Sequence, residues 1–303
     1  MESVGHESGG SRPADLSVEF SYSCITYRLC ENVHTVERTK CARGAAPGNR
    51  KPLRIDKAAN GLPIWQEALF GIEVLLLHAA PVYYGLGVPK GDGSAVVIIP
   101  GFMLTDLYLV EMYGWLSRMG YRPYFSGIGL NADCPNLLIR RKLTETIDRA
   151  RRETGRKIHV IGHSLGGVLA RSIAGDLPDD IASVITLGAP FRGTVAHPTL
   201  LQAVDLVRKQ IKQNHGPKVL PNCYSGACTC AFLDSLGRDL PDSVLATAIY
   251  TRNDGLVDWR YCVTGNPEVD HEVSGTHVGL GFNPSVYHII AKRLAAVRSL
   301  QLA

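Results

Sequence analysis

The chain lacks the long apolar runs of a membrane protein. Its 303 residues contain no stretch of about 20 uncharged apolar residues, the length that a membrane-spanning helix needs. The N-terminus opens Met-Glu-Ser-Val-Gly-His-Glu and has neither the basic segment nor the apolar segment of a secretory signal. These two absences predict a chain without a transmembrane segment and a cytoplasmic location.

An excess of charge and a cysteine framework are also absent. The 32 Lys and Arg against 28 Asp and Glu leave a net charge of +4, which is too small to favour nucleic acid as a partner. Eight cysteines are too few for a disulfide scaffold and do not fix the compartment. What is present is ordinary globular composition, with 45% hydrophobic and 20% charged residues, in a chain long enough for a sizeable core.

Residues 1–60 have a different pattern from the rest of the chain. Gly-Ser and Pro-Gly-Asn clusters favour loops, although apolar residues alternate over 18–24 as they do in a short strand. Basic residues gather between Arg38 and Lys57, a run that favours a solvated face over an anion-binding site. We expect residues 1–60 to form a weakly ordered N-terminal arm and residues 61–303 to form the folded domain.

An amphipathic helix is predicted over residues 64–80. Two glutamates, Glu67 and Glu73, interrupt an otherwise apolar segment. Four apolar residues recur at helical spacing, namely Trp65, Leu69, Ile72 and Leu76. We expect this stripe to lie on the core of the domain.

Strands and helices alternate along the rest of the chain. Apolar runs predict strands at 94–99, 122–126, 158–161, 181–187 and 244–251, with a short one ending near residue 274. Helical stripes between them predict helices that end at Gly120, at Gly155 and before Pro178, and a last helix that begins at Asn283. This alternation implies an α/β fold, with a mostly parallel central sheet and helices on both faces.

The alternation is interrupted at residues 195–242, where no strand is evident. A helix comes first, followed by a Cys-rich turn and a short helix around Phe232. The first helix has apolar residues at helical spacing: Leu200, Val204, Val207 and Ile211. We interpret the segment as a small helical cap insertion over one end of the sheet.

The cysteines of this insertion have an unusual pattern. Cys223, Cys228 and Cys230, considered together with Cys262, do not have one of the common zinc spacings. Three interpretations stay open: thiols that pack as small apolar groups, one or two disulfides, and a metal site.

The most informative motif lies in residues 157–167. Here Gly162-His163-Ser164-Leu165-Gly166 matches the G-x-S-x-G pattern of a nucleophilic serine on a tight strand-to-helix turn. The pattern alone is weak, but an apolar strand runs into it and a helical stripe leaves it. Glycines on either side leave room for neighbouring elements, and a helix that begins at Leu165 points its N–H groups at a developing oxyanion. The motif predicts a nucleophile at Ser164.

Five segments resemble the α/β-hydrolase superfamily, and in particular its bacterial triacylglycerol lipases and esterases. They are residues 100–102, 162–167, 187–194, 253–257 and 275–279, in the family's order. The resemblance implies an α/β-hydrolase fold and hydrolysis of carboxylic esters, a reaction that needs no cofactor and no metal. Residues 1–60 and the Cys-rich insertion lie outside it.

The family's catalytic roles carry over to three positions. Ser164 corresponds to the nucleophile, His277 to the general base and Asp254 to the acid that orients the histidine. Serine needs a base because its hydroxyl is a poor nucleophile, and the histidine needs a carboxylate to hold its tautomer. The chain order Ser, Asp, His is the one expected for this fold. We prefer Asp254 to Asp258 because it lies in the turn directly after a strand.

By the same resemblance, the oxyanion hole consists of the backbone N–H groups of Phe102 and Leu165. Lipases of this group usually have His-Gly before the first donor, whereas this chain has Pro100-Gly101. The hole itself survives this change because the donor is a main-chain N–H. The bonding that the family's histidine gives to its loop is lost, so we expect a less secure loop geometry. For His163, beside the serine, we expect a packing role.

Three functions compete. The leading one is a serine hydrolase that cleaves esters of small molecules or lipids, and contact with a lipid surface is compatible with it. An acyltransferase or a thioesterase would use the same triad, so the sequence does not exclude either. A non-catalytic binding protein of the same fold usually lacks a triad member, whereas all three candidates are present here.

Overall fold

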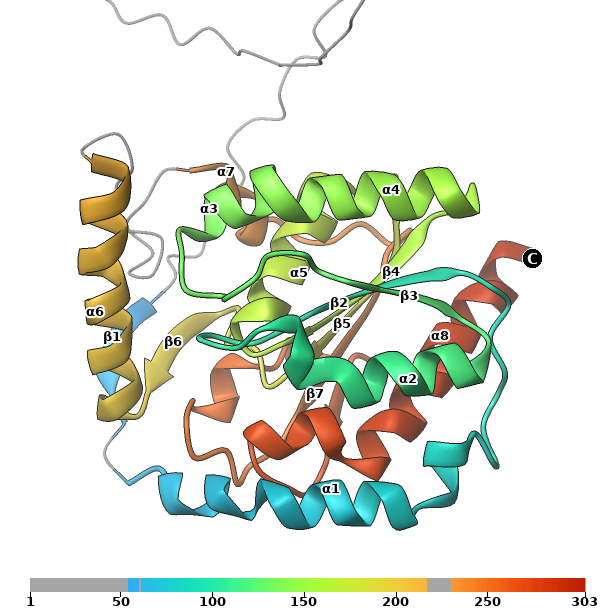
Figure 1. Ribbon diagram of the computed structural model, residues 1–303, viewed down its shortest axis with the longest axis horizontal. Helices are drawn as coiled ribbons and strands as arrows, with labels where there is room; N and C mark the ends of the chain where they lie inside the picture. The colour runs from blue at the N-terminus through green and yellow to red at the C-terminus, as the bar shows by residue number, and fades with distance from the viewer. Residues whose placement is uncertain (1–53, 60, 217–229, 303) are drawn as a thin grey trace, which may run out of the picture. The chain divides into compact units, whose positions relative to one another are not determined.

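Six parallel strands form the central sheet of the protein. The computed structural model describes residues 54–59, 61–216 and 230–302 (Figure 1). The strands are β2 (Ala95–Ile99), β3 (Arg122–Phe125), β4 (Ile158–His163), β5 (Ile181–Leu187), β7 (Leu245–Tyr250) and β8 (Asp270–Glu272). They are arranged in the order β3-β2-β4-β5-β7-β8, and every neighbouring pair is parallel. The parallel sheet predicted from the sequence is confirmed.

Helices cover both faces of this sheet (Figure 1). One face is covered by α3 (Pro135–Leu138), α4 (Thr144–Thr154), α5 (Leu165–Asp176) and α7 (Ala231–Leu236). The other is covered by α1 (Phe70–Ala79), α2 (Val110–Met119) and α8 (Pro284–Leu302). Short turns join them: η1 (Ile64–Leu69), η2 (Pro81–Tyr84), η3 (Asp106–Leu109), η4 (Ile139–Leu143), η7 (Trp259–Tyr261) and η8 (Val278–Phe282). Within the described residues, no helix is long and apolar enough to cross a bilayer.

Alternate side chains of each strand enter two separate cores, because successive residues of a strand point to opposite faces of the sheet. Val97 of β2 packs with Leu169 of α5 in one core. Its neighbour Ile98 packs with Leu116 of α2 in the other. A strand buried on both faces is apolar throughout, which is why the runs of Ile and Val predicted these strands well.

A second, two-stranded sheet was not predicted. It pairs β1 (Arg54–Ala58) with β6 (Gly193–Ala196) in parallel. The predicted arm, residues 1–60, therefore ends in a strand at 54–58, and the rest of that prediction falls outside the described residues. The segment 195–242 also begins with strand residues of β6, contrary to the expectation that it contains no strand.

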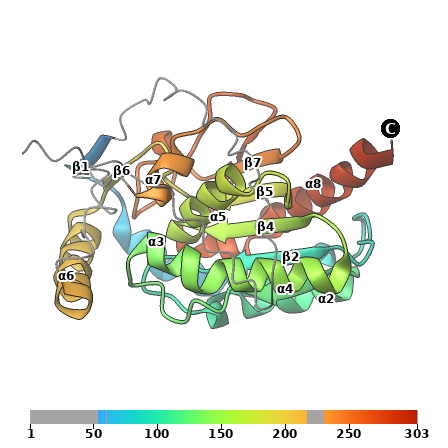
Figure 2. The same cartoon turned by 90° about the horizontal axis from the view of Figure 1, so that it is seen from above.

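The insertion contains α6 (Pro198–His215) and α7, and the structure does not describe residues 217–229 between them. Figure 2 shows α6 beside β1 and β6. The end of its predicted stripe is buried, at Val207 and Ile211. A role of this segment as a cap over a site stays a prediction.

Two of the insertion's cysteines, Cys223 and Cys228, lie outside the described residues. Cys230 is half-buried at the start of α7, where it packs against the core that contains α5. Cys262 is a buried thiol that packs with Ala196 and Val257. Cys262 therefore behaves as a small apolar residue of the core.

The first helix faces the opposite way from the prediction, which was wrong. The expected core stripe is exposed in η1 and α1, at Trp65, Leu69, Ile72 and Leu76. Glu67 and Glu73 are buried instead, each 9% exposed. A buried carboxylate is tolerated when hydrogen-bond donors surround it, and both glutamates find donors on loops far along the chain.

Two neighbouring leucines of α1 test this orientation. Leu77 is fully buried, so Leu77→Ala should lower the free energy of unfolding by about 2–5 kcal/mol. Leu76 is 56% exposed, so Leu76→Ala is the matched control and should change it by about 0.5 kcal/mol or less. Urea denaturation measures both values. A loss for Leu76→Ala as large as that for Leu77→Ala would contradict the orientation.

Candidate active site

Ser164 lies on the tight turn between β4 and α5. Its backbone φ of 51° and ψ of −123° are values that residues other than glycine rarely adopt. The turn is held by the Ser164 N–H, which donates to the carbonyl of Leu187 at 2.8 Å, and by the Ser164 carbonyl, which accepts from Gly167 N–H at 2.9 Å. The strained backbone therefore fixes Ser164 at the carboxyl end of β4.

Glycine is required at two positions of this turn because the backbone segments nearly touch. A Cβ at Gly162 would overlap the carbonyl group of Gly166. A Cβ at Gly166 would overlap the carbonyl oxygens of Ile99 and Pro100, at the end of β2. These contacts are the physical reason for the glycine spacing around the serine.

Asp254 and His277 form a buried hydrogen-bonded pair. Asp254 follows β7 and His277 follows β8, and Asp254 Oδ2 lies 2.5 Å from His277 Nδ1. Both side chains are at most 2% exposed. The other oxygen of Asp254 accepts the N–H groups of Leu256 at 2.9 Å and Val257 at 2.8 Å. The acid is thus fixed by its own turn and directed at the histidine.

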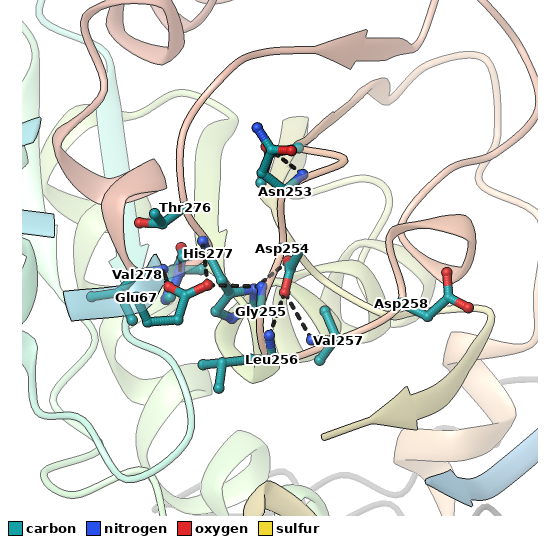
Figure 3. Close-up of polar contacts among 12 residues, drawn as sticks. Glu67, Asn253, Asp254, Gly255, Leu256, Val257, Asp258, Thr276, His277 and Val278 are labelled. Carbon is teal, nitrogen blue, oxygen red and sulfur yellow. Dashed lines mark hydrogen bonds and ion pairs between the residues drawn. The ribbon is translucent and has the colours of Figure 1, made fainter. Parts of the chain in front are cut away.

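Asp258 takes no part in this pair. Its carboxylate forms an ion pair with Arg260, 2.9 Å from the guanidinium, and accepts the Arg260 backbone N–H at 3.1 Å. Figure 3 shows it apart from His277, on the far side of the Asp254 turn. Of the two carboxylates after β7, only Asp254 is hydrogen-bonded to His277.

Two neighbours of Ser164 lie close to His277, so the serine lies near the pair. The ring centroid of the adjacent residue, His163, lies 4.9 Å from that of His277. Leu187, the acceptor of the Ser164 N–H, is followed by Gly188, where a Cβ would lie 3.1 Å from His277 Nδ1. No hydrogen bond joins the Ser164 hydroxyl to His277 within the described residues, and such bonds commonly tighten only when substrate binds.

His277 has a raised pKa despite its burial. Burial lowers the pKa of the imidazole, but the charge of Asp254, its hydrogen bond and the charge of Glu67 together outweigh that effect. The pKa of His277 therefore lies above its ordinary value of 6.5. A histidine of this kind accepts a proton readily near neutral pH.

His163 does more than pack. Its Nε2 donates to the backbone carbonyl of His277 at 2.9 Å, and burial, together with the charge of His277, lowers the pKa of His163 to about 3. The ring is therefore neutral at pH 7. A neutral, buried histidine holds the loop of His277 without competing for a proton.

The loop after β2 brings the predicted oxyanion donors to the serine. A Cβ at Gly101 would lie 3.2 Å from Ser164 Cβ, so Phe102, the next residue, lies beside the turn. Leu165 is the first residue of α5, where N–H groups have no partner within the helix. Both predicted donors are thus adjacent to Ser164 in the structure.

Asn131 supports this loop, and the sequence analysis missed it. Its side-chain amide donates to the carbonyl of Pro100 at 2.8 Å. Its backbone exchanges two bonds with the same loop, donating to Leu104 and accepting from Met103, each at 2.9 Å. The buried Asn131 therefore supplies side-chain bonding to a loop that has Pro100 in place of the family's histidine, and the expectation of a less secure loop stays a prediction.

Glu67 and Glu73 also escaped the sequence analysis. Glu67 accepts backbone N–H groups from Gly255, His277 and Val278 (Figure 3). Glu73 accepts the backbone N–H of Thr276. These partners lie between 188 and 211 positions further along the chain. The only local signal was a glutamate pair inside an apolar segment.

Comparisons with known proteins find similarity to thioesterases and lipases. The sequence model of the palmitoyl protein thioesterase family matches residues 136–234, about a third of the chain. A triacylglycerol lipase from Burkholderia plantarii is 24% identical over 204 residues, which are 65% of this chain and 52% of the lipase. The chain thus spans about half the length of this curated relative.

Solved structures of α/β-hydrolases are similar over most of the chain. A monoacylglycerol lipase from Paleococcus ferrophilus is 14% identical with a TM-score of 0.44, over 69% of this chain and 97% of that one. An extracellular α/β-hydrolase from a Paenibacillus species is 15% identical with a TM-score of 0.41, over 67% of this chain and 98% of that one.

The parallel sheet, the strained serine between β4 and α5, and the Asp-His pair after the last two strands define an α/β-hydrolase fold. Within that superfamily the chain resembles the triacylglycerol lipases and esterases.

The Asp254–His277 pair predicts how the histidine titrates. In Asp254→Asn the raising effects of the carboxylate are lost while burial persists, so the pKa of His277 should fall below 6.5. The pH titration of the His277 ring, followed by NMR, measures this shift. Asp258→Asn is the matched control and should leave the titration unchanged. A pKa of His277 that moves equally in both variants would contradict the assignment.

Proposed function

We propose that the protein is a serine hydrolase that cleaves carboxylic esters through an acyl-enzyme intermediate. In this proposal Ser164 is the nucleophile and His277 is the general base. Asp254 orients the histidine and stabilises its protonated form. The backbone N–H groups of Phe102 and Leu165 stabilise the oxyanion. The substrate is an ester of a small molecule or of a lipid.

The observation that supports this most directly is the buried bond between Asp254 and His277, beside a serine on a strained turn. A carboxylate bonded to Nδ1 leaves Nε2 unprotonated and able to accept the serine proton. It also stabilises the imidazolium that forms when the proton moves. Strain at a single serine is typical of sites where the chemistry requires that backbone.

The reaction then proceeds in two halves. Ser164 Oγ attacks the acyl carbon while His277 Nε2 takes the hydroxyl proton, and the oxyanion of the tetrahedral intermediate is stabilised by the two N–H groups. The bond to the leaving alcohol breaks as His277 returns the proton to it, and Ser164 stays acylated. Water, deprotonated by His277, then attacks the acyl carbon. The bond to Ser164 Oγ breaks as His277 returns the proton to that oxygen, which releases the carboxylic acid and the free serine.

A thioesterase is the second candidate. The palmitoyl protein thioesterase match covers Ser164 and α5, although it ends before Asp254 and His277. The same steps cleave a thioester, with a thiol in place of the alcohol as the leaving group. The two candidates therefore differ in the leaving group and share the same triad.

A series of nitrophenyl esters and matched acyl thioesters, of short to long acyl chains, tests the proposal. Ser164→Ala should fold normally and lose about three or more orders of magnitude in kcat for every ester that wild type hydrolyses. Ser172→Ala is the matched control, a buried serine on α5 that should keep its turnover. Near wild-type turnover of Ser164→Ala would refute the proposal, and turnover of thioesters alone would favour the second candidate.

A further inference from the structure

Two buried carboxylates remain unexplained by the triad. Glu67 of η1 and Glu73 of α1 belong to the segment that covers the loops after β7 and β8. Burying a carboxylate is costly unless hydrogen bonds compensate it. Both carboxylates accept such hydrogen bonds, but their partners differ.

Glu67 contacts both loops of the acid-base pair. Its Oε1 accepts the N–H of Gly255 at 2.8 Å and the N–H of His277 at 3.1 Å. Its Oε2 accepts the N–H of Val278 at 2.8 Å. Gly255 adjoins Asp254, so one carboxylate oxygen joins the backbone beside the acid to the backbone of the base (Figure 3).

Within the described residues, the hydrogen bonds of Glu73 go to the loop of the base. It accepts the Thr276 backbone N–H at 3.0 Å and the Thr276 hydroxyl at 2.6 Å. A Cβ at Gly279 would overlap its carboxylate, which explains a glycine of the motif around His277. Glu73 is thus a second glutamate of the same exposure as Glu67, and within the described residues no hydrogen bond joins it to the Asp254 loop.

The sequence of the Asp254 loop also fits a close approach of Glu67. A Cβ at Gly255 would lie 2.9 Å from Glu67 Oε1 and 2.8 Å from the carbonyl of Pro63. Any larger residue would push η1 away from the loop. The Asn-Asp-Gly turn is therefore more than a common turn sequence, because its glycine makes room for the carboxylate.

We propose that Glu67 is a positioning residue of the active site, whose carboxylate fixes the loop of Asp254 and the loop of His277 to each other. This inference rests on the proposed function of that pair. The carbonyl side of the same loop is held separately, by His163 on His277 and by the Tyr108 hydroxyl on Val278 at 2.6 Å. The backbone of His277 is thus bonded on both sides, and within the described residues Glu67 is the member of this set that also bonds Gly255, beside the acid.

The charge of Glu67 adds an electrostatic effect. Asp254 and Glu67 both raise the pKa of His277, and no such contribution comes from Glu73. His163, whose ring faces His277, is neutral at pH 7, and Tyr108 lies beyond it with a raised pKa. Removing the charge of Glu67 therefore lowers the pKa of His277. The acidic limb of the kcat/KM profile follows the neutral fraction of the base, so it moves to lower pH.

The experiment compares Glu67→Gln with Glu73→Gln in the full chain. In Glu67→Gln the amide cannot accept all three N–H groups and has no charge. We expect kcat to fall about 10- to 100-fold with KM within about twofold, since the base is misplaced relative to the acid. The acidic limb and the NMR titration of His277 should both move to lower pH. In Glu73→Gln we expect a loss of thermal stability comparable to that of Glu67→Gln. The acidic limb of kcat/KM and the NMR titration of His277 should both stay unchanged.

Two outcomes would overturn the inference. One is a Glu67→Gln variant whose kcat and titration match those of Glu73→Gln, which would make Glu67 merely structural. The other concerns Glu67→Asp, which keeps the charge and serves if Glu67→Gln does not fold. We expect this variant to keep the acidic limb of wild type, because the charge remains, and to have a lower kcat, because the shorter side chain cannot hold both loops. A wild-type kcat would contradict the proposed positioning role of Glu67. The NMR titration of His277 needs no turnover, so it tests the role of Glu67 even in an inactive variant. The proposed function is tested by a separate result, because an active Ser164→Ala variant would refute it.

Discussion

The 2.5 Å hydrogen bond between Asp254 and His277 is the interaction on which the rest of the site depends. Both side chains are almost inaccessible to water, so each loses its hydration when the protein folds. A buried charge pair is stable only when further hydrogen bonds satisfy its remaining groups. Here the Asp254 turn supplies two backbone donors, and the rest of the support comes from outside that turn.

That support comes from segments far apart in the sequence. Glu67 and Glu73 accept the backbone N–H groups of the His277 loop, while His163 and Tyr108 donate to its carbonyls. Hydrogen bonds from several segments restrict the positions that this loop can adopt. In the proposed reaction, a histidine held in this way is close to its working position before substrate arrives, which reduces the reorganisation that catalysis requires.

The fold was more predictable than the site's support. Strands such as Ile181–Leu187 are apolar throughout because helices cover both faces, and that signal is local. The G-x-S-x-G turn and the Asn-Asp-Gly turn are local as well. The orientation of α1 could not be predicted from local sequence. Its buried face is determined by backbone N–H donors about 200 positions away, whereas the apolar stripe predicted that the opposite face is buried. Asn131 was missed for the same reason, since nothing near it in the sequence indicates that it binds Pro100.

The proposed reaction requires that Ser164 forms a covalent bond to the acyl group. The most direct measurement is peptide mass spectrometry of the full chain after reaction with a serine-reactive alkyl phosphonate. We predict one phosphonyl group per chain, on the peptide that contains Ser164, with hydrolysis lost in proportion to labelling. Loss of activity with the label on a different residue, or full labelling of Ser164 with activity intact, would contradict it.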